Sequence, residues 1–329
     1  MKAVHLIYGP GGPRAFLTGL GTTFALRLSG LTEWSTIGGV SGGSMPALFT
    51  AAGLNPIEIV EKLMALDFRQ LMRASASGED KMLEHAADEN GILPRSKGFI
   101  ARLLQRNAMH SDMLGEAIES VVKTWPENFW TLAMSETSHV LFTSVGVYEY
   151  DFDGTMRVLS SEPAPVGLAI RATCAIPGLL EPVQYKGRML FDGSLSPFGS
   201  CPVGFVRKHF FAESDTIVKC MAVGSSSGTR ERWLVNLGRR LLCHQKADKE
   251  MMAHQADINI QPFTDELHTF RFKLTEEQKR GGLLAGFNAA VHELARHAVS
   301  FQDRFELKIP APCRDFAELL GLAQGTPSE

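Results

Sequence analysis

The sequence lacks both a run of basic residues and a long apolar run. Lysine and arginine number 33 against 36 acidic residues, which gives a formal net charge of −3. Recognition of nucleic-acid phosphates needs a basic patch or stripe, so we exclude nucleic acid as a partner. No apolar stretch reaches transmembrane length, and the apolar run at the N-terminus is too short for a signal-peptide core. We therefore expect a cytoplasmic protein.

Cysteine is also scarce. The chain has five, an odd number, and they are widely scattered without any C-x-x-C pair: Cys174, Cys201, Cys220, Cys243 and Cys313. This pattern argues against a disulfide framework and against a zinc site. We expect reduced, mostly buried thiols and no metal centre.

The first fifty residues alternate between strand and helix patterns. Residues 3–8 form an apolar run that ends in a glycine- and proline-rich turn, and residues 15–28 then carry apolar side chains at helical spacing. Residues 36–37 and 44–52 repeat this strand, turn and helix order. Such alternation implies a mainly parallel sheet covered by helices, so we expect an α/β fold.

The rest of the chain extends this pattern without repeats, low-complexity tracts or convincing linkers. Asn55 and Pro56 begin a helix that should reach residue 72, residues 73–91 fit a surface lid, and Ser111 should cap a helix that runs through residue 122. Other predicted elements are strands at 138–150 and 216–223, a hairpin at 183–190 with its turn at Lys186 and Gly187, helices at 164–172, 233–254 and 284–305, and a disordered end at 323–329. We expect one large α/β domain with helical additions.

A serine motif stands at the second turn. The pentapeptide GVSGG at residues 39–43 matches G-x-S-x-G, which places a nucleophilic serine on a sharp turn between a strand and a helix. Gly39 and Gly43 fit such a turn because the positions two before and two after the serine crowd one another. Ser41 is then a candidate nucleophile that needs a base and donors for an oxyanion.

Gly11 and Gly12, at the end of the first strand, are suited to supply oxyanion donors. Adjacent parallel strands bring their C-terminal turns together at one edge of a sheet, so the two glycine-rich turns should face each other. Arg14 could hold this loop or meet a substrate phosphate. The alternative, a nucleotide-phosphate loop, lacks the third glycine of the dinucleotide fingerprint and has no following G-K-[ST].

No histidine is an obvious candidate for the base that would accept the proton of Ser41. In the common serine hydrolases with this motif, the serine turn follows several strands and precedes an acid and a histidine, whereas here it follows one or two strands. His292, His297, His244 and His254 all lie on helical patterns. The sequence therefore disfavours an ordinary α/β-hydrolase.

Four ordered blocks resemble the patatin-like phospholipases: GGPR at 11–14, GVSGG at 39–43, ATCAIP at 172–177 and FDGS at 191–194. The resemblance implies a three-layer α/β/α fold with a catalytic core at 1–205, while 206–329 complete the same domain with helical additions. It implies a serine–aspartate dyad without histidine, in which Ser41 is the nucleophile and Asp192 the base. Gly193 supports the turn that holds Asp192.

Three positions depart from the family's pattern. In the oxyanion loop, G-G-G-x-[RK]-G, Pro10 replaces the first glycine and Ala15 the last, and Ser194 follows Asp192 and Gly193 where the family has Gly or Ala. Proline has no N–H, so the oxyanion donors should be the amides of Gly11, Gly12 or Gly42.

Asp192 must be desolvated to act as a base, because an exposed aspartate has a pKa of about 3.9. Leu190 and Phe191 before it supply apolar surroundings. Taken alone, an Asp-Gly pair is more typical of a turn, and the four ordered blocks favour catalysis.

The resemblance implies a lipid acyl hydrolase that needs no metal or other cofactor. Its substrates would be phospholipids, lysophospholipids or other acyl lipids, met at a bilayer surface without insertion, and residues 177–180 are a candidate entry for the acyl chain. Two alternatives stay open. One is an acyltransferase on the same scaffold, and the other is a lipid-binding or regulatory protein that has lost turnover.

Overall fold

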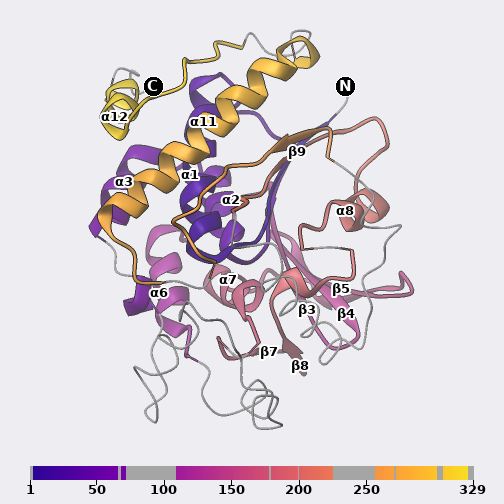
Figure 1. Cartoon of the computed structure of the whole chain (residues 1–329). Helices are drawn as coiled ribbons and strands as arrows, with labels where there is room; N and C mark the ends of the chain where they lie inside the picture. The colour runs from indigo at the N-terminus through magenta and orange to yellow at the C-terminus, as the bar shows by residue number, and fades with distance from the viewer. Residues whose placement is uncertain are drawn as a thin grey trace.

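A mixed eight-stranded sheet lies between layers of helices (Figure 1), and the described residues also form a separate two-stranded sheet. The computed structural model describes residues 3–65, 68–71, 109–177, 179–198, 200–224, 256–269, 272–301 and 307–324. The strands are β1 (Val4–Tyr8), β2 (Thr36–Gly39), β3 (Phe129–Met134), β4 (Ser138–Thr143), β5 (Gly146–Asp151), β6 (Met156–Ser160), β7 (Val183–Tyr185), β8 (Arg188–Leu190), β9 (Thr216–Cys220) and β10 (Ile258–Ile260). The helices are α1 (Gly12–Leu28), α2 (Ser44–Ala51), α3 (Pro56–Ala65), α6 (Asp112–Val121), α7 (Val166–Cys174), α8 (Val203–His209), α11 (Glu276–Phe301) and α12 (Phe316–Gln324), with short 3₁₀ turns η1 (Ser41–Gly43), η2 (Phe68–Leu71) and η3 (Gly193–Leu195).

The sheet has the strand order β10-β9-β1-β2-β3-β4-β5-β6. The five strands from β10 to β3 pair in parallel, and β4, β5 and β6 continue from β3 as an antiparallel meander. A parallel strand needs a crossover, and α1 supplies the one between β1 and β2. The predicted α/β/α fold with a mainly parallel central sheet is confirmed.

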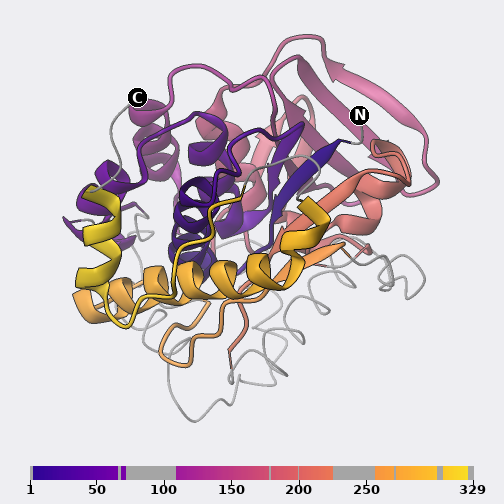
Figure 2. The same ribbon diagram turned by 90° about the horizontal axis from the view of Figure 1, so that it is seen from above.

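Both faces of β1 are buried, as expected for a central parallel strand. Leu6 and Tyr8 face the core formed with α1, α2 and α11, whereas Ile7 faces a second core formed with α8. Figure 2 shows α11 lying across α1, with the strands on the other side of α1. This packing fixes how the helices lie against the sheet, and the turns lie at the ends of the strands.

The C-terminal ends of four parallel strands lie level with one another. Tyr8 pairs with Gly39 on one side and with Cys220 on the other, and Cys220 pairs with Ile260. The turns that follow these strands therefore gather at one edge of the sheet, which is where ligands bind in open α/β sheets.

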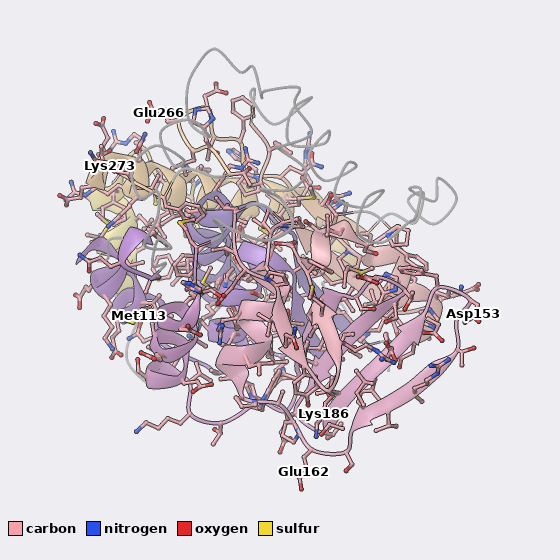
Figure 3. All side chains as sticks on the ribbon, turned by 90° about the horizontal axis from the view of Figure 1, so that it is seen from below. Met113, Asp153, Glu162, Lys186, Glu266 and Lys273 are labelled. Carbon is pink, nitrogen blue, oxygen red and sulfur yellow. The ribbon has the colours of Figure 1, made fainter. Side chains whose placement is uncertain are left out.

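The antiparallel part of the fold carries short turns at its outer edge. Figure 3 labels Asp153, in the turn between β5 and β6 at the edge of the molecule, and Lys186, in the turn between β7 and β8. Lys186 and Gly187 have φ values of 47° and 77°, as a two-residue hairpin turn with both central residues left-handed requires. The predicted hairpin at 183–190 is confirmed.

Three predicted helices differ from the structure at their ends. α3 ends at Ala65, and the 3₁₀ turn η2 follows it at Phe68–Leu71, so a single helix to residue 72 was wrong. Ser111 precedes α6, yet its side chain does not cap that helix; its hydroxyl accepts a hydrogen bond from Arg171 Nε at 3.2 Å. α11 begins at Glu276, ahead of the predicted residue 284, because Thr275 and Gln278 form a reciprocal capping box before it.

Several elements were not predicted, namely β3, β6, α8, β10 and α12. Residues 323 and 324 belong to α12, so the prediction that a disordered end begins at residue 323 was wrong. The lid at 73–91, the helix at 233–254 and residues 325–329 lie outside the described residues. Among the described helices, none combines the length and apolar character needed to cross a membrane. The cysteines that the structure describes are free thiols, and Cys174, Cys220 and Cys313 are buried.

Candidate active site

Ser41 lies on a sharp turn between β2 and α2. Val40 still has extended backbone angles, whereas Ser41 has a φ of 53°, in the left-handed region that side chains other than glycine rarely adopt. The 3₁₀ turn η1 follows directly and leads into α2. Such strain persists only where the surroundings fix it, and it is the geometry that the G-x-S-x-G motif predicts.

The glycines around Ser41 are required by close backbone contacts. A Cβ on Gly39 would lie 2.5 Å from the Gly43 carbonyl oxygen, and one on Gly43 would lie 2.3 Å from the Gly9 carbonyl oxygen. A Cβ on Gly42 would lie 2.2 Å from the carbonyl oxygen of Gly12. The turn of Ser41 therefore packs backbone to backbone against the glycine-rich loop after β1, so the expectation that the two turns face each other is confirmed.

The loop after β1 presents free amides beside this turn. Gly11 and Gly12 have φ values of 151° and 55°, and α1 begins at Gly12. Within the described residues, the amides of Gly11, Gly12 and Gly42 donate no hydrogen bond. Free N–H groups at the N-terminus of a 17-residue helix suit a negatively charged ligand atom.

Arg14 holds the glycine-rich loop from inside the protein. Its side chain is only 3% exposed, and Nη2 donates a hydrogen bond to Thr269 Oγ1 at 2.9 Å. The carbonyl oxygen of Thr269 also lies 2.0 Å from where a Cβ on Gly12 would stand. Of the two roles considered for Arg14, these contacts favour that of a loop anchor.

The structure brings Asp192 to Ser41 through β3. Phe191 forms an antiparallel bridge with Met134 at the end of β3, with N–H···O distances of 2.7 and 2.9 Å. The amide of Asp192 donates to the Ala175 carbonyl at 2.9 Å, just after α7. These backbone bonds carry Asp192 to the edge of the sheet where Ser41 stands, across 192 − 41 = 151 positions of sequence.

Burial governs the acidity of Asp192. The side chain is fully buried, and loss of water raises the pKa of its carboxyl from 3.8 to about 6. Hydrogen bonds from Ser194 and the nearby Ser41 hydroxyl act in the opposite direction, because they favour the ionised form. The desolvation that the sequence analysis required is therefore present.

The two oxygens of the Asp192 carboxylate differ. Oδ1 accepts the Ser194 amide at 2.8 Å, whereas Oδ2 is buried and has no hydrogen bond of ordinary geometry in the described part of the chain. The Ser41 hydroxyl lies close enough to favour the carboxylate, so a small movement would complete a hydrogen bond between them. An ionisable group with one buried, unpaired oxygen beside a strained serine is suited to accept a proton.

Sequence reasoning assigned no role to Thr173, although the block that contains it was recognised. The Ser41 amide donates to Thr173 Oγ1 at 3.0 Å, and this hydroxyl donates to the Leu132 carbonyl at 2.6 Å. The Ser41 amide is thus occupied and does not join the free amides beside it. The block at 172–177 was the signal for Thr173, while nothing in the local sequence pointed to Leu132.

His139 is poorly suited to act as a base for Ser41. His139 is buried, its Nε2 pairs with Ser196 Oγ at 2.8 Å, and burial lowers its pKa to about 3, which keeps it neutral. His292 and His297 lie on α11, as expected, and His297 contacts Glu293 one turn away. His244 and His254 lie outside the described residues.

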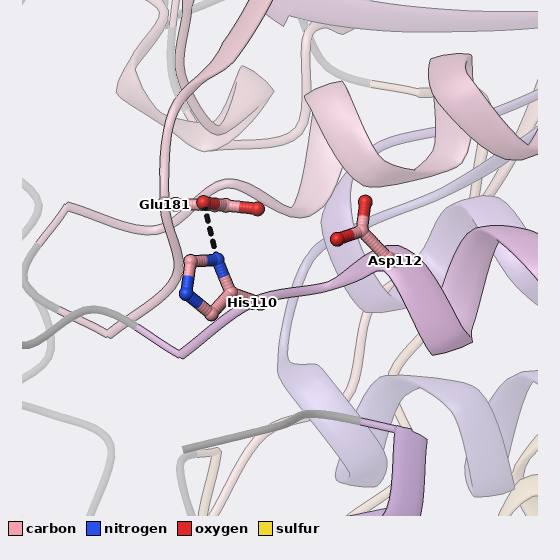
Figure 4. Close-up of side chains that lie close together, drawn as sticks. All are labelled: His110, Asp112 and Glu181. Atoms are coloured by element: carbon pink, nitrogen blue, oxygen red, sulfur yellow. Dashed lines mark hydrogen bonds and ion pairs between the residues drawn. The ribbon is translucent and has the colours of Figure 1, made fainter. Parts of the chain in front are cut away.

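One cluster of possible metal ligands lies near α6 and α7. His110, Asp112 and Glu181 place one ligand atom each within 4.8 Å of one another, and His110 Nδ1 pairs with Glu181 at 2.6 Å (Figure 4). The Arg171 guanidinium already contacts Asp112 at 2.7 Å and Glu181 at 3.3 Å. A cation would have to displace this arginine, so the cluster is better explained as an ion-pair network that joins α6 to α7.

Comparison with known proteins assigns the chain to a family. Residues 9–202 match the family described as patatin-like phospholipase, which is more than half of the 329 residues. The chain belongs to the patatin-like phospholipase family. Membership supports lipid acyl hydrolase activity in general and lipid substrates. A search of curated proteins found no match.

A solved structure with a similar fold is that of VipD from Legionella pneumophila. It aligns with a TM-score of 0.49 and 15% sequence identity, over 90% of this chain and 67% of that chain.

Thr269, which lies beyond the residues that match the family, holds part of the glycine-rich loop through its hydrogen bond with Arg14. The C-terminal part thus contacts the loop that faces Ser41.

Two departures from the patatin-like pattern have clear structural settings. Ala15 is buried in the first turn of α1, where its amide donates to the Gly11 carbonyl at 3.3 Å, so the helix accommodates its methyl group. Ser194 donates its amide to Asp192, which lies at the start of η3. Asp192 is therefore the cap of a 3₁₀ turn, and the hairpin turn considered as an alternative lies at Lys186 and Gly187.

Replacing Gly42 by Ala should damage both the site and the fold. The added Cβ would stand 2.2 Å from the Gly12 carbonyl oxygen, so one of the two turns must shift. We expect the free energy of unfolding to fall by about 1–3 kcal/mol and ester hydrolysis to fall by about 100-fold. Chemical denaturation and hydrolysis of a soluble short-chain ester measure the two effects.

Gly281→Ala is the matched control, because no atom lies within 4 Å of its added Cβ on α11. It should leave hydrolysis unchanged and raise the stability by up to about 1 kcal/mol, since alanine is the better helix former. Wild-type hydrolysis by Gly42→Ala would show that the close approach of the two turns does not matter for the reaction.

Proposed function

We propose that this protein hydrolyses carboxylic esters of lipids through a dyad of Ser41 and Asp192. The observation that carries the proposal is the buried Asp192 carboxylate, whose Oδ2 has no hydrogen bond of ordinary geometry among the described residues, and which the nearby Ser41 hydroxyl favours in its ionised form. A carboxylate with a pKa of about 6 is ionised at neutral pH and is a stronger base than an exposed aspartate. The strained turn presents the Ser41 hydroxyl to it.

Acylation follows from this geometry. Asp192 accepts the proton of Ser41 as Oγ attacks the ester carbonyl carbon, and the carbonyl oxygen takes up the negative charge. The free amides of Gly11, Gly12 and Gly42 are the proposed donors to that oxygen. When the carbon–oxygen bond of the ester breaks, the departing alcohol takes the proton from Asp192, and the acyl group stays on Ser41.

Deacylation repeats the same steps with water. Asp192 removes a proton from a water molecule that attacks the acyl carbon, and the Ser41 oxygen leaves and regains a proton from Asp192. The products are a free fatty acid and the restored enzyme. This cycle uses only groups of the chain and requires no added cofactor.

The proposal extends to the setting of the reaction. We propose phospholipids and lysophospholipids as substrates, met by transient contact with a bilayer surface in the cytoplasm. The contact of Thr269 with Arg14 supports the view that residues 206–329 belong to the same domain as the core at 1–205. Residues 177–180 stay a proposed entry for the acyl chain.

Release of fatty acid from dispersed phospholipid and lysophospholipid tests the proposal. We expect turnover by the wild type in buffer that contains a chelator and no acyl acceptor other than water. Turnover that appears only after an alcohol or thiol acceptor is added would instead support an acyltransferase. Failure of a fluorophosphonate to modify the protein would support a binding or regulatory protein without turnover.

The pH dependence of hydrolysis should report Asp192. Only the ionised carboxylate can accept the Ser41 proton, so kcat/KM for a soluble ester should fall below pH of about 6, by about tenfold per unit. Ser194→Ala should move this acidic limb to higher pH, because it removes the side-chain hydrogen bond of Ser194 that lowers the pKa of Asp192 and leaves the backbone bond in place. A pH profile from 4 to 9 measures both.

Ser120→Ala is a matched control for this profile, because Ser120 lies on the exposed surface of α6 and its hydroxyl donates to the Ala117 carbonyl within the same helix. It should leave the limb in place. An acidic limb near pH 4 in the wild type, the value of an exposed aspartate, would contradict the assignment of the base to a buried carboxylate.

A further inference from the structure

Thr173 lies between the two turns that carry the proposed dyad. It is fully buried in the last turn of α7, and its hydroxyl makes two hydrogen bonds. It accepts the Ser41 amide at 3.0 Å and donates to the Leu132 carbonyl at 2.6 Å. Because each bond uses a different part of the hydroxyl, one side chain ties the nucleophile turn to β3.

The Leu132 carbonyl also meets the turn of Asp192. A Cβ added to Gly193, the residue after Asp192, would lie 2.1 Å from that carbonyl oxygen and 2.9 Å from Val40 Cγ1. The backbone of the Asp192 turn therefore packs against the same carbonyl that Thr173 bonds. The hydroxyl of Thr173 and the backbone of Gly193 therefore both lie against the Leu132 carbonyl of β3.

The end of α7 holds Asp192 as well. The Ala175 carbonyl, two residues after Thr173, accepts the amide of Asp192 at 2.9 Å. A short stretch of chain thus fixes Ser41 through a side chain and Asp192 through a main-chain carbonyl. A change in the Thr173 bonds would move Ser41 relative to Asp192 while leaving the bonds of Asp192 intact.

We propose that Thr173 is a positioning residue, whose hydroxyl sets the location of Ser41 relative to Asp192 and keeps the Ser41 amide out of the oxyanion site. The inference rests on the proposed function and adds a residue to it. The left-handed backbone of Ser41 makes such a restraint necessary, because the turn would otherwise relax toward more favourable angles. A misplacement of about 1 Å can lower a reaction rate by about 100-fold.

Three variants separate positioning from simple stabilisation. Thr173→Val keeps the shape and removes the hydroxyl, whereas Thr173→Ser keeps the hydroxyl. Thr22→Val is the matched control, because Thr22 is also fully buried and its hydroxyl has two partners as well, the Gly286 carbonyl at 3.2 Å and Cys220 Sγ at 3.3 Å.

For Thr173→Val we expect kcat for a soluble ester and the rate of fluorophosphonate modification to fall together by about 100-fold, with little change in KM. Thr173→Ser should stay within about threefold of the wild type, and Thr22→Val should lose stability without losing rate. The acidic limb of the pH profile should move to higher pH in Thr173→Val, because the Ser41 hydroxyl that lowers the pKa of Asp192 is displaced. A role in stability alone would not move that limb.

Wild-type kcat in folded Thr173→Val, or an equal loss of rate in Thr22→Val, would overturn the proposal. Thr173→Ala removes the same hydroxyl and replaces the valine variant in these measurements if that variant is insoluble. If neither variant folds, the hydroxyl is required for folding, and this result would also overturn the proposal. If the wild type itself neither hydrolyses esters nor reacts at Ser41, the proposed function fails, and the role of Thr173 falls with it.

Discussion

Replacing Ser41 by Ala is expected to lower ester hydrolysis by about 10⁴-fold or more. The variant loses the oxygen that forms the acyl-enzyme, and the buried Asp192 alone has no covalent route to the ester. The fold should persist, because the bonds of the turn to Thr173 and Ser44 use the Ser41 backbone. Fatty-acid release and the mass of fluorophosphonate-treated protein measure the loss, and no adduct should form.

Ser29→Ala provides the comparison for this loss. Ser29 is as deeply buried as Ser41, and its hydroxyl bonds the Ala25 carbonyl at the end of α1, away from the site. Its hydrolysis rate should match that of the wild type. Retention of hydrolysis by Ser41→Ala, or an unchanged adduct mass, would exclude Ser41 as the nucleophile.

Asp192→Asn should lose activity and gain stability at the same time. Hydrolysis should fall by about 10³-fold or more, since an amide cannot accept the Ser41 proton. The gain in stability follows from the raised pKa of the buried carboxyl, because folding must strip water from a charge at neutral pH. A shift from 3.8 to about 6 corresponds to about 3 kcal/mol, and we expect about 1–3 kcal/mol after the amide finds partners.

The gain in stability of Asp192→Asn over the wild type should increase as the pH rises. Below pH 3.8 the wild-type carboxyl is protonated in both the folded and the unfolded state, so Asp192→Asn gains nothing there. Between pH 3.8 and about 6 the wild type loses stability as pH rises, and above about 6 the full difference remains. Urea denaturation at pH 4 and pH 7.5 measures this difference, and an equal stability of the two proteins at pH 7.5 would contradict it.

The nucleophile turn could be predicted from sequence because its determinants are local. The crowded backbone around Ser41 admits only glycine at positions 39, 42 and 43, and these positions all lie within five consecutive residues. The facing loop at Gly11 and Gly12 followed from the parallel pairing of adjacent strands. The capping box before α11 was equally local but was obscured by Gly281 and Gly282, which weaken the helical pattern.

The partner of Ser41 could not be found from local sequence. An Asp-Gly pair alone is typical of a turn, and only the order of four family blocks pointed to Asp192. What brings the two together is β3, an apolar strand that the sequence analysis did not identify. Thr173 and the Leu132 carbonyl were missed for the same reason, since their bonds join segments distant in sequence.

The most direct test measures the rate at which a fluorophosphonate modifies Ser41 in the wild type and in Asp192→Asn between pH 4 and pH 9, with the adduct located by peptide mass spectrometry. Our account predicts modification at Ser41, controlled in the wild type by a group with a pKa of about 6 and slowed by about 100-fold or more in Asp192→Asn. Equal rates for the two proteins, or an adduct on another residue, would contradict it.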